Sequence, residues 1–278
     1  MSTALATAAR RNNALHEWLA FSLQILIAVS VELFDDLSRG LISQRGTLEG
    51  VMNAQRVVSF EAAHGLWVEP AWQTFFEHTH QIFAVSITWA ESARAMNGVY
   101  VLGHVFVTLS VAVWVYFYHR RYFPFLRNTV ILTNLFALFL YESFPVAPPR
   151  LTPDLVFNHH SFVFQDTLYG VFSATGKMVG TNAAYNEFSA MPSIHVAWAM
   201  IVAAAVIWLA QPLLLKLLAA LYPCVMLLAV VVTGNHYLLD AAGSVVIVAL
   251  AALVALSFER WKASAMRTRM CRRPAESG

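Results

Sequence analysis

Charged residues are scarce in this chain. Asp, Glu, Lys and Arg make up 12% of its 278 residues, whereas a soluble domain contains about 25%. Hydrophobic residues make up 58%, and the mean hydropathy is +0.58. This number of charged residues is too small to cover a surface that faces water. The composition therefore excludes an ordinary soluble domain and predicts an integral membrane protein.

A strong net charge and a cysteine framework are also missing. The formal net charge is only +2, which gives no indication of a nucleic-acid partner. Cys224 lies in an apolar run and Cys271 in a basic tail, so the two cysteines form neither a disulfide framework nor a metal-binding spacing.

Long apolar runs are what the chain does contain. We predict an all-α polytopic membrane bundle of about six transmembrane helices, because each span needs about 20 mostly apolar residues. The predicted spans are 15–34, 98–118, 127–146, 192–210, 213–233 and 237–257. Arg10–Arg11 ahead of the first run resembles an export signal, but the run is long and no clear cleavage site follows it, which favours a retained helix.

Two regions between the spans have a different character. Across 35–97, polar residues interrupt apolar ones at helical spacing, which predicts amphipathic helices at the membrane interface, and a further span near 81–95 stays open. The 147–190 segment is a long loop, and long ordered loops usually carry function. No repeat or linker divides the chain, so 1–278 is interpreted as a single domain.

The distribution of Lys and Arg predicts the orientation, because cytoplasmic segments hold the excess of these residues. With six spans and both termini in the cytoplasm, twelve of the 18 Lys and Arg residues fall on the cytoplasmic side. The ends of the spans near Arg150, His195 and His236 then meet at the extracytoplasmic face.

His236 and Asp240 are four residues apart, so a helix brings them together on one face. A carboxylate bonded to one imidazole nitrogen fixes the tautomer and leaves the other nitrogen free to attack. The alternative is a pair that only stabilises the helix end. Ionisable groups at the start of a membrane helix are costly, however, which favours a function.

His195 lies two residues after Ser193 at the start of another predicted helix, where free backbone N–H groups can bind an anion and a His can protonate a leaving oxygen. Ser193 as a simple helix cap is the alternative. Arg150 follows a proline-rich exit from a span, and its guanidinium can grip phosphate oxygens in a fork, or it can simply reach toward the interface. Lys177 and Asn235 are further candidates for contacts with a head group.

These residues together suit phosphoryl transfer through a phosphohistidine. At this point the sequence resembles the type 2 phosphatidic acid phosphatase superfamily, and within it the branch of the inositol phosphorylceramide synthases. The resemblance rests on Pro145–Leu151, Asn186–Trp198 and Thr233–Gly243 and, more loosely, on Asn53–Ala54, Glu61 and Gly65–Pro70.

The resemblance implies a helical bundle with its active site at the extracytoplasmic surface of the plasma membrane. His236 would be the nucleophile, Asp240 its orienting carboxylate and His195 the general acid, while Arg150 and Ser193 would hold phosphoryl oxygens. No metal or other cofactor is implied. The partners would be a membrane lipid substrate and, for transfer, a polyol acceptor such as inositol.

Three positions depart from the superfamily's usual motifs. Ser143 replaces a Lys, Ile194 replaces a Gly, and Val230 occupies the place of an Arg. Other readings therefore remain: transfer to an alcohol instead of hydrolysis, a non-catalytic relative that binds a lipid head group, or a transporter with a His/Asp proton relay. The motifs do not separate hydrolysis from transfer, because both share the first half-reaction.

Overall fold

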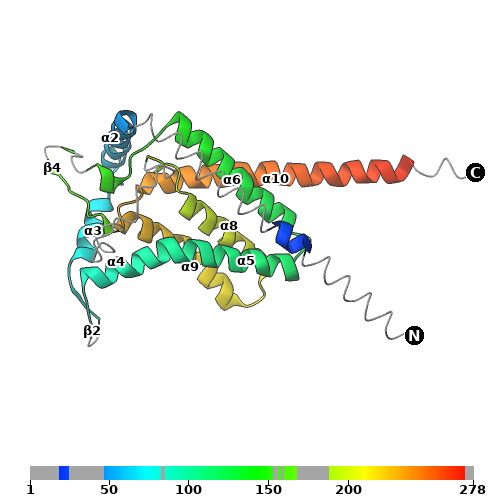
Figure 1. Ribbon diagram of the computed structural model, residues 1–278, viewed down its shortest axis with the longest axis horizontal. Helices are drawn as coiled ribbons and strands as arrows, with labels where there is room; N and C mark the ends of the chain where they lie inside the picture. The colour runs from blue at the N-terminus through cyan, green and yellow to red at the C-terminus, as the bar shows by residue number, and fades with distance from the viewer. Residues whose placement is uncertain are drawn as a thin grey trace, which may run out of the picture.

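The computed structural model describes residues 19–24, 47–82, 85–152, 156–157, 160–167 and 188–272. Helices dominate these residues (Figure 1). In chain order they are α2 (Thr47–Ala63), α3 (Glu69–Glu77), α4 (Trp89–Gly98), a π-helix (Val99–Gly103), α5 (His104–Tyr118), α6 (Phe123–Ser143), a 3-10 turn (Pro149–Leu151), α8 (Ile194–Leu209), α9 (Leu213–Val232) and α10 (Leu238–Arg272). Two short antiparallel hairpins pair β1 (His80–Ile82) with β2 (Val85–Ile87) and β3 (Val156–Phe157) with β4 (His160–Ser161).

The predicted helical membrane bundle is confirmed. Within the described residues, four helical stretches are long and apolar enough to cross a membrane: Trp89–Tyr118, Phe123–Ser143, Leu213–Val232 and Leu238–Met266. The span predicted at 192–210 corresponds to the shorter apolar helix α8. Of the first predicted span, 15–34, the structure describes residues 19–24 as helix, and the rest lies outside the described residues.

The helix predicted over 98–118 begins earlier, at Trp89. A capping box fixes this start, because the Thr88 N–H donates to the Glu91 carboxylate at 2.8 Å and the Thr88 side chain caps the first turn. The residues ahead of it pair as the β1–β2 hairpin, with His80 opposite Ile87. The structure therefore shows no separate span at 81–95 among the described residues, because the second half of this region begins the helical stretch Trp89–Tyr118.

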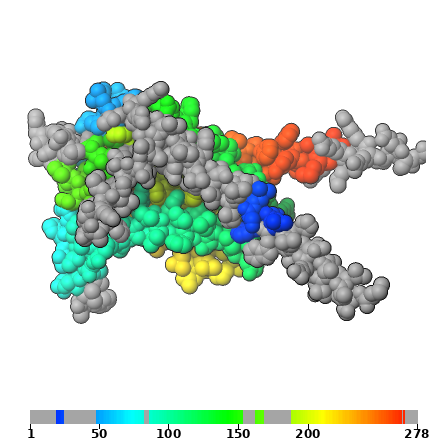
Figure 2. Space-filling model, in the orientation of Figure 1, coloured from blue at the N-terminus to red at the C-terminus, as the bar shows by residue number. Residues whose placement is uncertain are grey.

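The last helix extends fifteen residues beyond its predicted end at 257, to Arg272. Its second half projects beyond the other long helices (Figure 2). Lys262 pairs with Glu259 at 2.6 Å on this half. The apolar run ends before Glu259 and Lys262, but residues that favour a helix continue after them. Hydropathy alone therefore predicted the end of this helix too early.

Helix α8 is the central element of the bundle. It contacts α5, α6, α9 and α10. Small residues such as Ala197, Ala199 and Ala203 are buried along it and let the neighbouring helices approach closely. Large apolar side chains such as Phe106 and Leu218 are instead exposed on the outer helices, as expected for surfaces that face lipid.

The helices α2 and α3 lie across one end of the bundle (Figure 1). They fall in the region predicted as amphipathic and interfacial, and α2 is anchored there by a hydrogen bond from the Asn53 side chain to the Pro145 carbonyl at 2.9 Å. At the same end, Val146 and Ser189 form a parallel bridge that joins the exit of α6 to the approach of α8. The segments around Arg150, His195 and His236, which were expected to meet, lie together at this end, since Arg150 bonds to Gly234 and His236 lies against the Ala190 carbonyl.

Candidate active site

A tight turn between α9 and α10 presents His236. The Val230 carbonyl at the end of α9 accepts hydrogen bonds from the N–H groups of Asn235 and His236, at 3.0 and 3.1 Å. Gly234 makes this turn possible, since its φ of +69° lies in the left-handed region that favours glycine. A Cβ at Gly234 would also lie 3.3 Å from the Cβ of Arg150. The turn therefore packs directly against the arginine.

The imidazole of His236 is held through Nδ1. This atom lies 2.6 Å from the Ala190 carbonyl oxygen and 3.2 Å from Oδ2 of Asp240. Both partners accept hydrogen bonds, so we assign the proton to Nδ1, which leaves the Nε2 lone pair available. Asp240 is fully buried, and its Oδ2 also accepts from the Tyr237 N–H at 2.8 Å. The carboxylate of Asp240 is therefore held by a backbone N–H at the start of α10.

The approach to α8 supplies the second side of the site. The bridge with Val146 positions Ala190, whose carbonyl reaches His236. Three residues after Ala190, the Ser193 N–H donates to the Asp240 carbonyl at 3.3 Å. The two helix starts are thus fastened to each other by backbone groups.

Arg150 is buried beside the same turn. Its Nε–H donates to Oδ1 of Asn235 at 2.9 Å, and a terminal nitrogen pairs with Asp166 at 3.4 Å. Its own backbone N–H donates to the Gly234 carbonyl at 2.9 Å. The guanidinium therefore has a fixed position, set by the stiff Pro148–Pro149 exit and by contacts 16 and 85 residues away in the chain.

Two candidate residues have structural roles in addition to those predicted. The side chain of Ser193 caps α8 by accepting from the Val196 N–H at 3.4 Å. Asn235 holds Arg150 with its oxygen and donates to the Thr233 hydroxyl with its nitrogen at 2.8 Å. The amide of Asn235 therefore holds the arginine in place, and its contact with a head group stays a prediction. Lys177 lies outside the described residues.

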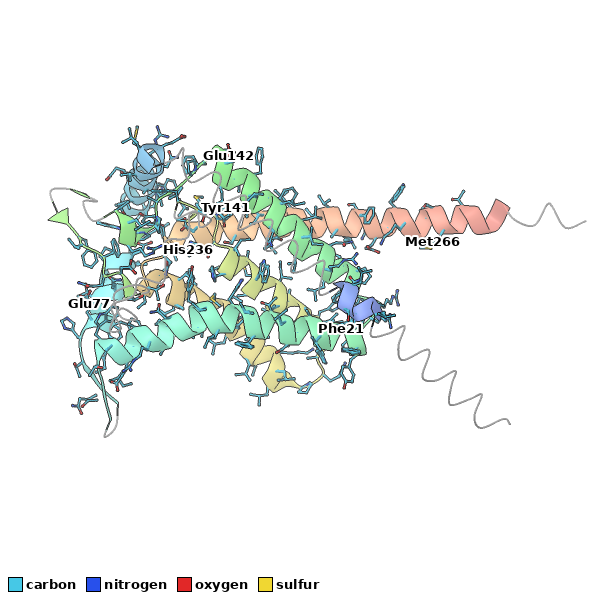
Figure 3. The ribbon with its side chains drawn as sticks, in the orientation of Figure 1. Phe21, Glu77, Tyr141, Glu142, His236 and Met266 are labelled. Atoms are coloured by element: carbon cyan, nitrogen blue, oxygen red, sulfur yellow. The ribbon has the colours of Figure 1, made fainter. Side chains whose placement is uncertain are left out.

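His195 faces His236 from the first turn of α8, with ring centroids 6.0 Å apart (Figure 3 labels His236). The Tyr100 ring stacks on His195 at 4.0 Å, and the His104 ring lies 4.4 Å from it. Sequence reasoning missed Tyr100 and His104. Tyr100 lies within the π-helix and His104 directly follows it, and such an irregularity often marks functional sites. An aromatic and a histidine four residues apart in an apolar run were the available signal.

A family model described as the PAP2 superfamily matches residues 55–254, which is 200 of the 278 residues. The chain belongs to the PAP2 superfamily. No curated protein and no solved structure matches it. Membership in the PAP2 superfamily supports a phosphatase or phosphotransferase activity that acts on phosphoric esters.

The positions that depart from the superfamily's usual motifs have clear places in the fold. Val230 is fully buried in an apolar cluster with Tyr100 and Met226, where a charged side chain would have no partner. Ile194 is buried against α6 and Ala197. Ser143 donates to the Phe139 carbonyl at 2.8 Å on its own helix. Packing therefore explains why Val230 and Ile194 are apolar. Among the described residues, Arg150 is a cation that bonds to the turn before His236.

Across the part of the chain that the structure describes, no group of three or more His, Cys, Asp and Glu side chains is arranged to hold a metal ion. His236 and Asp240 are bonded to each other and to backbone groups.

Proposed function

We propose that this membrane protein is a lipid phosphatase or phosphotransferase that works through a phosphohistidine on His236. The observation that carries the proposal is the Nδ1 contact of His236 with the Ala190 carbonyl and Asp240, which directs Nε2 away from α10. His195 and Arg150 reach the same turn from two other elements. A nucleophile, an acid and a phosphate-binding cation therefore converge.

In the first half-reaction, Nε2 of His236 attacks phosphorus and the bond from phosphorus to the lipid oxygen breaks. His195 donates its proton to the leaving oxygen. Nδ1 keeps its proton, and Asp240 with the Ala190 carbonyl stabilises the charge that the ring gains. Arg150 and Ser193 bind the phosphoryl oxygens, where the guanidinium offsets the developing charge.

In the second half-reaction, a hydroxyl group attacks phosphorus, His195 accepts its proton, and the bond between Nε2 and phosphorus breaks. Water as the acceptor gives hydrolysis, and a polyol such as inositol gives transfer. The substrate class is a phospholipid or diphospholipid. The resemblance to the inositol phosphorylceramide synthase branch supports transfer, and hydrolysis needs no additional acceptor site.

The distribution of basic residues supports an extracytoplasmic active site. Arg120 and Arg121 lie in the turn from α5 to α6 and Arg127 lies near the start of α6, at the end of the bundle far from His236. Lys216 and Arg260 are on α9 and α10 toward that same end. Cytoplasmic ends hold the excess of Lys and Arg, which supports a site on the opposite face, with the plasma membrane as the expected location.

The test is covalent trapping with a panel of phospholipids and polyprenyl phosphates. Purified protein is denatured rapidly at alkaline pH, where phosphohistidine survives, and the modified peptide is identified by mass spectrometry. We expect phosphate on His236 and none after His236→Ala. His64→Ala is the matched control, because His64 is an exposed histidine at the same end of the bundle. Turnover that persists in His236→Ala would refute the proposal, and inositol-containing lipid among the products would decide for transfer.

A further inference from the structure

Two buried glutamates contact the first turn of α10. Oε1 of Glu69 accepts from the Leu238 N–H and Oε1 of Glu61 accepts from the Leu239 N–H, each at 2.6 Å. Asp240 takes the preceding N–H, that of Tyr237, at 2.8 Å. Three successive amides at the helix start are therefore capped by three carboxyl groups. Two of these groups come from α2 and α3, about 170 residues earlier in the chain.

The N-terminus of α10 is consequently not open to a phosphate. Its free amides, which would otherwise favour an anion, already have acceptors. These contacts instead fix the position of the first turn of α10. They hold the backbone at Leu238 and Leu239, directly between His236 and Asp240, so the spacing of the catalytic pair depends on them.

The two glutamates are neighbours at this helix start, because they accept from the amides of consecutive residues, Leu238 and Leu239. Both side chains are fully buried, and Oε2 of each is reached by no donor from another described residue. Two ionised carboxylates buried side by side repel each other, and a proton on one of them removes this repulsion. The arrangement therefore favours a carboxyl–carboxylate pair that carries one negative charge.

The charges around the pair favour this state. Burial, and next the charge of Glu69, raise the pKa of the Glu61 carboxyl to about 9. Burial also raises the pKa of Glu69. The titratable groups that face the pair are Asp240 and Tyr237, and His236 faces Asp240 in turn. A second negative charge on the pair would therefore act directly on the orienting carboxylate.

We propose that Glu61 and Glu69 are positioning residues for the reaction of His236, as a proton-sharing pair that caps α10 and holds the His236–Asp240 turn in register. This inference rests on the proposed function. Neither glutamate touches the reacting atoms. Both act through the backbone of α10 and through Asp240, and loss of the shared proton adds a buried charge that displaces the turn.

The experiment compares Glu61→Gln with Glu61→Ala. Gln keeps an oxygen for the Leu239 amide and supplies an N–H in place of the shared proton, whereas Ala removes both. With phosphatidic acid in detergent micelles, we expect Glu61→Ala to lose on the order of 10- to 100-fold in kcat with little change in KM. Glu61→Gln should keep kcat near the wild-type value at neutral pH.

The pH profile gives the readout that a purely structural cap would not move. Wild-type kcat should fall as the pH rises through about 9, the pKa of Glu61. In Glu61→Gln that alkaline fall should disappear or move upward. Glu49→Gln, an exposed glutamate in the first turn of α2, is the matched control and should keep the wild-type profile.

Melting temperature tests the shared proton independently of turnover. Folding raises the pKa of Glu61, so its stabilisation is complete below the unfolded value of 4.5 and is lost as the pH rises toward about 9. The melting temperature of the wild type should therefore fall by several degrees more than that of Glu61→Gln between pH 6 and about 10. Parallel melting curves, or full kcat in Glu61→Ala, would overturn the inference. Activity in His236→Ala would instead overturn the proposed function.

Discussion

Replacement of Gly234 by Ala tests whether the turn before α10 positions Arg150. Gly234 and Gly65 have nearly equal positive φ angles, +69° and +68°. An added Cβ at Gly65 meets nothing within 4 Å, whereas at Gly234 it meets the Arg150 Cβ at 3.3 Å. The two Ala variants therefore share the same backbone strain and differ in their contact with the arginine.

The strain of a non-glycine residue in the left-handed region is about 1–2 kcal/mol. Both variants should lose this amount of stability, which lowers the melting temperature by a few degrees. The added contact at Gly234 is tighter than ordinary packing, so Arg150 must move by a few tenths of an ångström. Small displacements of a binding group are costly, and we expect roughly a tenfold loss of kcat/KM in Gly234→Ala alone.

The assay is phosphate release from a lipid monoester by detergent-solubilised protein, with melting followed by intrinsic fluorescence. Equal melting temperatures for the two variants, with reduced turnover in Gly234→Ala only, would support the packing argument. Equal turnover in both would refute the idea that this turn sets the position of Arg150. A much lower melting temperature for Gly65→Ala would refute the equality of strain.

Three further substitutions address the site. Asp240→Asn should lower kcat about 100-fold, less than in a triad that depends on one carboxylate, because the Ala190 carbonyl still holds Nδ1; an unchanged kcat would show that Asp240 does not orient the ring. Tyr100→Phe should retain activity, because it keeps the ring that stacks on His195. Tyr100→Ala removes this ring and should lower kcat roughly 3- to 10-fold, in line with about 0.5–1.5 kcal/mol for such a pair. Equal kcat values for the two variants would argue against a role for the stacked ring. Arg150→Lys keeps the charge but loses the fork, so KM for the lipid should rise about tenfold, and full activity would exclude bidentate phosphate binding.

Local patterns in the chain determined much of this outcome. Apolar runs predicted the bundle because each span must satisfy its own backbone in lipid, whatever its neighbours are. The His236–Asp240 pair followed from a spacing of four, since a helix places such residues together without help from other elements. The start of the second span was missed because Glu91 and Arg94 lower the hydropathy of a helix whose first turns lie at the end of the bundle.

Contacts between distant segments decided the rest. The Ala190 carbonyl reaches His236 across 46 residues, Asn235 fixes Arg150 across 85, and Glu61 caps Leu239 across 178. Hydrophobic periodicity reports only which face of a helix is buried, and no periodicity specifies which helices become neighbours. The sequence by itself therefore determined the His236–Asp240 pair and its membrane setting. The packing of α2, α3, α4–α5 and α8 around α10 decided which groups hold that pair in place.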